Sequence, residues 1–279
     1  MRQILLILLI LSFSFVYSQD IKQTFDFANE LYNKKDYEGA SISYRRVIYF
    51  DKADQYRKDC YKNIADCLYE TQQFEEAADY YELAFFQQKS DSSKAEVIFR
   101  KLSCFLILNS FDYAEIELLS LPSNLTPKQA QRKMFYSAVL NFSIEKYDLA
   151  KSQFLSLIDS TNKETKEKIE QLFTKNEKIN QLSPRKAKIM SMLIPGLGQF
   201  YAGDLKNGFN SMVLTVGIAT LGIATAVKST SPFDVLVTAA PWFQRYYMGG
   251  YKKAEQIAIN EKKRRRSKVY NQILNELSY

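Results

Sequence analysis

A pattern of alanine and aromatic residues repeats through the first 160 residues of the chain. Ala40, Ala77, Ala114 and Ala150 lie 37, 37 and 36 residues apart, each with an aromatic residue three positions before it and a large apolar residue four positions after it. This helical spacing predicts two helices per unit, joined by a short polar turn. Helix pairs of this kind bury their apolar faces only against neighbouring pairs. The pattern therefore predicts an all-α solenoid of four helix pairs over residues 19–160.

The repeat resembles the tetratricopeptide repeat. The small residues and aromatics of that family are matched in the first unit by Ala28, Tyr37, Ala40 and Tyr44, and the second unit matches equally well. The third and fourth units depart from the pattern, since Leu102 replaces a small residue and Asn141 replaces an apolar one. The period is also longer than the family's usual 34 residues, which predicts extended turns between units.

The resemblance implies a concave groove, lined by the first helix of each pair, that binds a peptide or a partner protein. The aromatic residues among the implied groove positions fit the core as well as they fit the groove. The implied positions are Asn29, Tyr32, Asp66, Tyr69, Phe99, Phe135 and Phe142.

Residues 161–183 are rich in charged residues and contain neither glycine nor proline. Ile169, Leu172 and Phe173 form one apolar stripe at helical spacing. We expect a solvated linker helix here.

A glycine-rich stretch, IPGLGQFYAGDLKNG, occupies residues 194–208 and precedes the uncharged run 209–227. It lacks the third glycine of a dinucleotide-binding loop and the Gly-Lys-Ser/Thr end of a P-loop, so phosphate binding of either type is not expected. The nineteen-residue run would extend about 28 Å as a helix, close to the ~30 Å of a bilayer's hydrocarbon core. Lys/Arg-rich flanks favour lipid headgroups. We predict a transmembrane helix.

A second, poorer span follows at 232–249, with Pro241 inside it and Trp242 and Tyr246 suited to a membrane interface. Together the two segments predict a transmembrane hairpin; one span followed by an interfacial helix is the alternative. Small residues at spacings of four, three and four would let the helices approach closely. This seam consists of Thr215, Ala219, Gly222 and Ala226.

Residues 184–255 resemble the TM2-type hairpin domain and related PGxGQxY membrane modules, although TM2 domains often have His at the position of Gly198. The resemblance implies a membrane module and no reaction. The residues that carry it are Pro195, Gly196, Gly198, Gln199, Tyr201, Gly203 and Gly208.

The N-terminus has the layout of a secretory signal peptide over residues 1–18, with an uncleaved anchor as the alternative. Cleavage would place the repeats outside the cytoplasm. A hairpin would then return the basic run 262–266 to the same side, against the positive-inside rule, whereas a single span would satisfy both signals. We favour the hairpin on the family resemblance.

Composition narrows the chemistry. The chain has no histidine, and its three cysteines, Cys60, Cys67 and Cys104, have no metal-ligand spacing, so we expect buried thiols. We expect no catalytic residue, cofactor or metal, and so no enzyme. From Arg185 onward, 14 Lys/Arg outweigh 5 Asp/Glu, a net +9. In the tail 256–279 this charge favours anionic lipid over nucleic acid.

The sequence thus predicts a membrane-anchored adaptor or scaffold of a bacterial cell envelope, with the inner membrane favoured. Its exported solenoid would bind a protein or peptide, residues 209–249 would lie in the bilayer, and the membrane helices could form a homo-oligomer. The alternative is an accessory subunit of a transport or envelope assembly, in which Gln199, Asp234 and Arg245 would face each other inside the bilayer.

Overall fold

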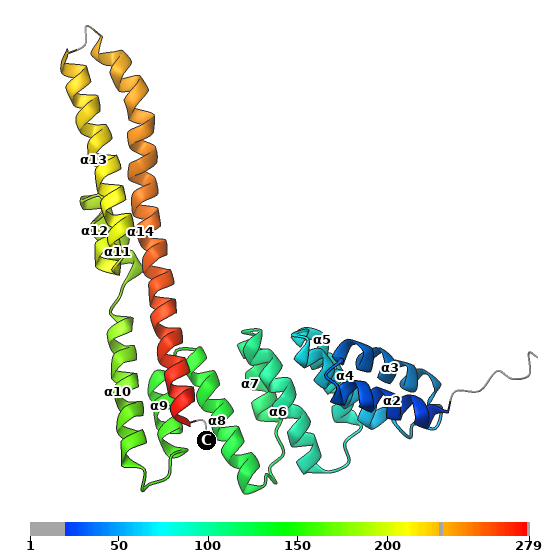
Figure 1. Cartoon of the computed structure of the whole chain (residues 1–279). Helices are drawn as coiled ribbons and strands as arrows, with labels where there is room; N and C mark the ends of the chain where they lie inside the picture. The colour runs from blue at the N-terminus through cyan, green and yellow to red at the C-terminus, as the bar shows by residue number, and fades with distance from the viewer. Residues whose placement is uncertain (1–19, 229–230, 278–279) are drawn as a thin grey trace, which may run out of the picture. The chain divides into compact units, whose positions relative to one another are not determined.

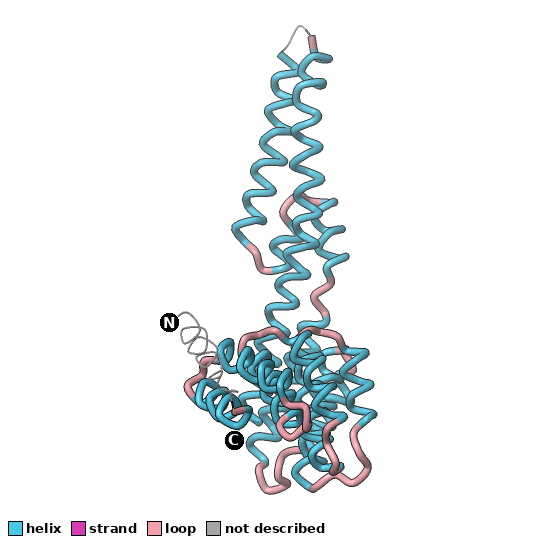
Figure 2. The backbone as a smooth tube through the Cα atoms, turned by 90° about the vertical axis from the view of Figure 1, so that its right-hand side faces the viewer, coloured by secondary structure: helices cyan, strands magenta, loops and turns pink. Residues whose placement is uncertain are grey.

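The computed structural model describes residues 20–228 and 231–277; the predicted signal peptide lies outside this part of the chain. The described residues fold into helices and turns with no β-strand, which confirms the all-α class (Figure 2). They divide into two compact units, one ending at Leu157 and the other beginning at Ile158.

The first unit, which we call the repeat unit, contains eight helices, and each packs against the next along the chain (Figure 1). Four pairs of a first and a second helix follow one another. The helices are α2 (Ile21–Asn33), α3 (Tyr37–Phe50), α4 (Arg57–Glu70), α5 (Phe74–Phe86), α6 (Asp91–Ile107), α7 (Phe111–Ser120), α8 (Pro127–Ser143) and α9 (Tyr147–Ser156).

The backbone repeats with the same period as the sequence. The turn inside each pair contains one left-handed residue that is not glycine: Lys35, Gln72, Asn109 and Glu145, with φ of 62°, 62°, 57° and 65°. The next residue's N–H donates to the carbonyl five positions earlier in all four turns, as in Asp36 N to Leu31 O at 2.9 Å. This pattern is the Schellman motif, which ends a helix by satisfying its last carbonyls.

The alanines mark the places where helices touch. Ala40, Ala77, Ala114 and Ala150 are completely buried. A side chain of one carbon lets two helix backbones approach closely, and the larger apolar residues four positions later fill the core beside it. Those residues include Tyr44, Tyr81 and Phe154, all fully buried.

The three cysteines lie in this core as free thiols, as the sequence predicts. Burial raises the pKa of each thiol, Cys60, Cys67 and Cys104, to about 12. A thiol held neutral in this way is a poor nucleophile and a poor metal ligand.

The second unit is built around one long helix. α14 runs for 46 residues and contacts each of the other four helices (Figure 1). The elements are α10 (Lys163–Asn180), α11 (Pro184–Leu193), α12 (Leu197–Ala202), α13 (Leu205–Lys228) and α14 (Pro232–Leu277).

The charged linker and the basic tail are packed together, contrary to the expectation of a solvated helix and a separate tail. Ile169 and Phe173 of α10 are buried, and so are Val269 and Ile273 of α14. The two helices run antiparallel, since Lys168 pairs with Glu276 while Asn180 meets Lys262. The apolar stripes of α10 and α14 pack against each other, while the charged faces of both helices stay on the outside.

One helix in the described part of the chain, α13, is long and apolar enough to cross a membrane. In the most apolar stretch of α13, only 6% of the residues are buried within the protein. The core helix of a water-soluble protein would bury most of that surface. The predicted second span, in the first part of α14, is not apolar enough over the length needed to cross a membrane.

Candidate functional site

The glycine-rich stretch forms two sharp turns around the short helix α12. Gly196 precedes α12 with φ of 93°, and Gly203 follows it with φ of 92°. Both values are left-handed, a conformation that glycine adopts without steric cost. Pro195 lies just before the first turn, where α11 has ended.

Two further glycines permit close packing instead of turns. A Cβ on Gly198 would stand 1.8 Å from the carbonyl oxygen of Ala187, and a Cβ on Gly208 would stand 2.4 Å from the ring of Phe200. No side chain fits at either position without displacing the backbone of α11 or the aromatic ring. The motif therefore fixes α12 against α11 on one side and α13 on the other.

Gln199 is the central polar residue of this site and is completely buried. Its side-chain oxygen accepts from Ser191 Oγ at 2.7 Å, and its amide nitrogen donates to the Gly250 carbonyl at 2.9 Å. Ser191 Oγ also accepts from the Gly198 N–H at 2.9 Å. A buried amide with partners on both ends specifies a unique arrangement of three helices.

Tyr201 and Asp204 anchor the two ends of the motif. Tyr201 Oη donates to the Gln181 carbonyl at 3.0 Å and accepts from the Ser183 N–H at 3.1 Å. Asp204 caps α13 by accepting from the Asn207 N–H at 3.0 Å. That N–H and the Asn207 side-chain amide lower the pKa of Asp204, so the carboxylate stays ionised and complements the positive end of the helix dipole.

Several basic residues of the predicted tail bind helix ends within the unit. Lys262 Nζ donates to the Asn180 carbonyl at 3.3 Å, and Arg266 donates to the Asn180 side-chain oxygen at 2.7 Å. Arg265 reaches the Ala202 carbonyl at 3.4 Å. Asn180 and Ala202 are the last residues of α10 and α12, where cations are favoured. Lys263 and Lys268 of the same tail are exposed.

The small-residue seam of α13 faces α14. Ala219, Gly222 and Ala226 line a cavity of about 320 Å³ together with Ala239, Ala240 and Phe243 of α14. A Cβ on Gly222 would lie 3.4 Å from that of Ala239, which is ordinary contact. Thr215, the first residue of the seam, is buried at 1% exposure.

Most of the implied groove residues of the repeat unit are buried or make contacts within the fold. Phe99 and Phe142 are buried, so their assignment to a groove wall is wrong and they belong to the core. Tyr32 packs edge-on against Tyr37, and Tyr69 packs in the same way against Phe74.

Polar groove positions are also engaged within their own helix pair. Asn29 accepts a 2.6 Å hydrogen bond from Tyr44, and Asp66 accepts one of the same length from Tyr81. Phe135 is half-buried and lies 6.4 Å from the Phe154 ring, centroid to centroid.

Of the predicted trio Gln199, Asp234 and Arg245, Gln199 and Arg245 line one cavity. Gln199 already makes two hydrogen bonds within the fold. Asp234 and Arg245 lie on the same continuous helix, where eleven residues correspond to about 16 Å along the axis.

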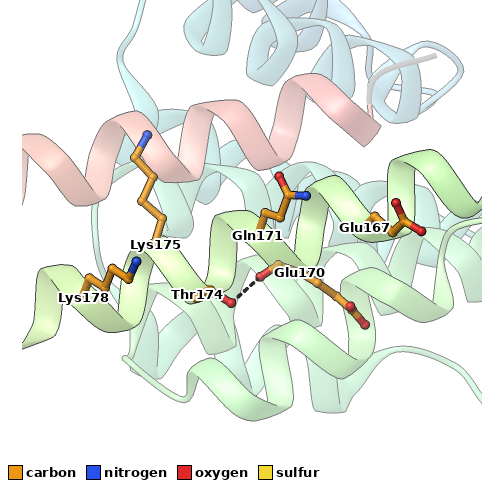
Figure 3. A pocket seen from close by; sticks show the side chains of 6 residues that line it. All are labelled: Glu167, Glu170, Gln171, Thr174, Lys175 and Lys178. Atoms are coloured by element: carbon orange, nitrogen blue, oxygen red, sulfur yellow. Dashed lines mark hydrogen bonds between the residues drawn. The ribbon is translucent and has the colours of Figure 1, made fainter.

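A further hollow lies along α10 and is lined by a single face of that helix (Figure 3). The side chains of Lys175 and Lys178 extend from the surface, and Thr174 Oγ1 donates to the Glu170 carbonyl of the same helix at 3.0 Å. No group of three potential metal ligands occurs among the described residues. Mixed charges on the exposed face of one helix do not converge on a ligand.

No protein-family model matches the chain, and no curated protein matches it.

Proposed function

We propose that the chain is a membrane-anchored adaptor in which the repeat unit binds a partner protein and the second unit holds the complex at a bilayer. The observation that carries this proposal is the outward-facing apolar surface of α13. Leu221 and Val227 are 70% and 80% exposed, and a surface of this kind along 24 residues is compatible with lipid.

The two family resemblances support the same division of labour. The repeat unit would belong with tetratricopeptide-type solenoids, and its recurring helix ends and buried alanines suit that assignment. The motif from Pro195 to Gly208 would form the base of a membrane hairpin of TM2 or PGxGQxY type. In that arrangement α13 and the first part of α14 would be the two arms, with residues 209–249 in the bilayer.

The partner surface suggested by the structure differs from the groove implied by the family. Large apolar side chains are exposed on the second helices of the first three pairs, where a partner protein could cover them. They are Ile42, Tyr49 and Phe50 of α3, Phe86 of α5, and Tyr113, Ile116 and Leu119 of α7.

The leader would send the repeat unit across the inner membrane of a cell envelope. Reporter fusions after Lys175, Lys228 and Tyr279 test this topology. A hairpin places the first and third reporters outside and the second inside. A single span places the second and third on the same, cytoplasmic side and rejects the hairpin.

The adaptor role is tested by crosslinking the full chain to its partners in intact cells. We expect Tyr49→Ser with Phe86→Ser to remove the crosslinked partners, whereas Lys52→Ser with Lys89→Ser, also on exposed positions, keeps them. Unchanged partners in the double aromatic variant would refute this surface. A chain ending at Leu157 should keep its partners and leave the membrane fraction; loss of every partner would refute an autonomous binding unit.

A further inference from the structure

An open cavity of about 340 Å³ lies between α13 and α14, beside the glycine-rich motif, and we call it the polar cavity after the polar residues among its lining. The residues that line it bring hydroxyls, side-chain amides and two cations together at the start of the apolar helix. They are Gln199, Asn207, Asn210, Ser211, Leu214, Thr215, Arg245, Tyr246, Gly249, Gly250 and Lys253.

Two hydroxyls in this cavity lack a partner. Thr215 is 1% exposed, and its Oγ1 has no hydrogen bond with the described residues; the same is true of the buried Ser211 Oγ. A buried hydroxyl without a partner costs free energy. Gly250 makes room for Ser211, since a Cβ there would stand 2.6 Å from Ser211 Oγ. Both residues line the cavity, so an occupant that reaches their hydroxyls would supply the missing hydrogen bonds.

The charge of the cavity favours an anion. Arg245 and Lys253 both line it, and none of the lining residues described is acidic. The Asp204 carboxylate lies close enough to Lys253 to interact with it electrostatically and so compensates part of the Lys253 charge. Arg245 therefore presents the less compensated charge, and guanidinium groups suit the oxygens of a phosphate.

The apolar cavity lined by the seam residues continues along the same helix pair. The polar cavity is lined by residues 207–215 and 245–253, and the apolar one by residues 218–226 and 239–243. Between the two cavities the residue numbers rise along α13 and fall along α14. The helices are therefore antiparallel, and one cavity follows the other along them. A ligand with an anionic head and an apolar chain matches this order.

We propose that the α13–α14 pair binds a phospholipid with a net anionic headgroup, with its phosphate among Arg245, Lys253 and Thr215 and an acyl chain against Ala219, Gly222 and Phe243. This inference rests on the proposed location of α13 in a bilayer. It adds a specific headgroup site to what would otherwise be a general anchor.

Binding is measured with the full chain in neutral detergent micelles. The probe is brominated phosphatidylglycerol or brominated phosphatidylcholine, and the signal is quenching of Trp242, the chain's single tryptophan, which stacks on the cavity residue Tyr246. We expect tighter binding of phosphatidylglycerol. Replacing both cations, by Arg245→Gln with Lys253→Gln, should weaken that binding about tenfold or more.

Two matched controls separate a site from a basic surface. Lys252→Gln removes a neighbouring exposed charge outside the cavity, and Thr220→Val removes an exposed hydroxyl that bonds to its own helix. Thr215→Val should weaken phosphatidylglycerol binding several-fold, while both controls should bind as the parent chain does. If Lys252→Gln weakens phosphatidylglycerol binding as much as Lys253→Gln does, the proposal is overturned. Circular dichroism of each variant checks that the helices are retained.

Other outcomes are equally decisive. Inorganic phosphate that displaces the lipid at millimolar concentration, with the same dependence on Arg245, would assign the cavity to free phosphate and reject the lipid. Equal affinity for the two lipids would also reject it. Carbonate extraction of cell membranes reports anchoring independently: a chain that resists extraction but shows no headgroup preference loses this inference and keeps the proposed anchor, whereas a chain released by carbonate loses both.

Discussion

The repeat unit and the second unit both bury alanines where helices meet, but the second unit adds close contacts with the backbone itself. In the repeat unit alanine side chains meet at helix contacts and aromatic rings fill the space between them. In the second unit the closest contacts involve backbone, as where Gly198 lies against the carbonyl of Ala187. Side chains that fill space tolerate small shifts, whereas backbone contacts do not. The comparison implies that the second unit depends on a few positions and the repeat unit on many.

The largest effect is expected at Gly198. Gly198→Leu places a side chain where even a Cβ would stand 1.8 Å from the Ala187 carbonyl oxygen. We expect destabilisation of the second unit by more than about 4 kcal/mol, seen as proteolysis within residues 158–277 while the repeat unit stays resistant. Gly217→Ala is the control, because a Cβ there meets nothing within 4 Å. If both variants resist proteolysis like the parent chain, close backbone contact is not what holds the second unit.

An ion-pair cluster gives the next largest effect, within the repeat unit. Lys101 contacts the carboxylates of Glu82 and, at 2.7 Å, Glu117, whose side chain is 11% exposed. Lys101→Met leaves Glu117 buried without a counter-charge and should cost about 3 kcal/mol in urea unfolding. Glu117→Gln in the same chain should recover part of that loss. An additive double variant would show that the two groups are not coupled.

A smaller effect distinguishes two equivalent hydrogen bonds of the repeat. Tyr81 donates to the Asp66 carboxylate and Tyr44 donates to the Asn29 amide oxygen, both at 2.6 Å. Because a bond to a charged acceptor is stronger, Tyr81→Phe should lower the free energy of unfolding by about 2 kcal/mol and Tyr44→Phe by about 1 kcal/mol. Thermal denaturation of the two variants makes the comparison. Equal losses would mean that the charge of Asp66 has no influence on this bond.

Much of the repeat unit could be predicted from sequence because alanine marks each contact directly. The helix ends were less visible: the left-handed residues are Lys35, Gln72, Asn109 and Glu145, where glycine would have been the usual signal. They could have been found only from their shared spacing of 36 or 37 residues. The implied groove failed because polar and aromatic side chains on a first helix can bond to their own second helix equally well.

The sequence predicts the second unit as separate segments, because the residues of one helix, α14, change from apolar to basic along its length. The change from apolar to basic residues near 256 indicates a tail, yet Ala254, Ala258, Val269 and Ile273 are fully buried at helical intervals along α14. Those four residues are the signal that sequence reasoning missed. Contacts of the basic residues with the ends of α10 and α12 depend on tertiary structure, so no local pattern could predict them.

The smallest effect at neutral pH concerns the buried thiols. Their pKa values of about 12 exceed the ordinary thiol value of about 9. Below pH 9 the thiols are neutral in both the folded and the unfolded chain. Unfolding therefore releases no thiol proton, and the free energy of unfolding keeps its full value with respect to these groups. As pH rises from 9 to 12 the unfolded chain loses protons that the folded chain keeps, and stability falls.

A reagent for thiols tests this in the native protein. We expect almost no labelling of Cys60, Cys67 or Cys104 at pH 8 without denaturant and complete labelling in urea. A variant with all three cysteines changed to Ala should lose less stability between pH 9 and 12 than the parent chain. Fast labelling of the native chain would contradict the burial of these side chains.

The continuity of α14 has a mechanical consequence. If α13 and the start of α14 lie in a bilayer, the residues beyond Gly250 extend about 40 Å from it as one unbroken rod. A tilt of about 10° at the buried end would then swing the far end, and α10 with it, by about 7 Å. The helix would act as a lever, through which a change in bilayer thickness or in a bound lipid becomes a displacement on the aqueous side.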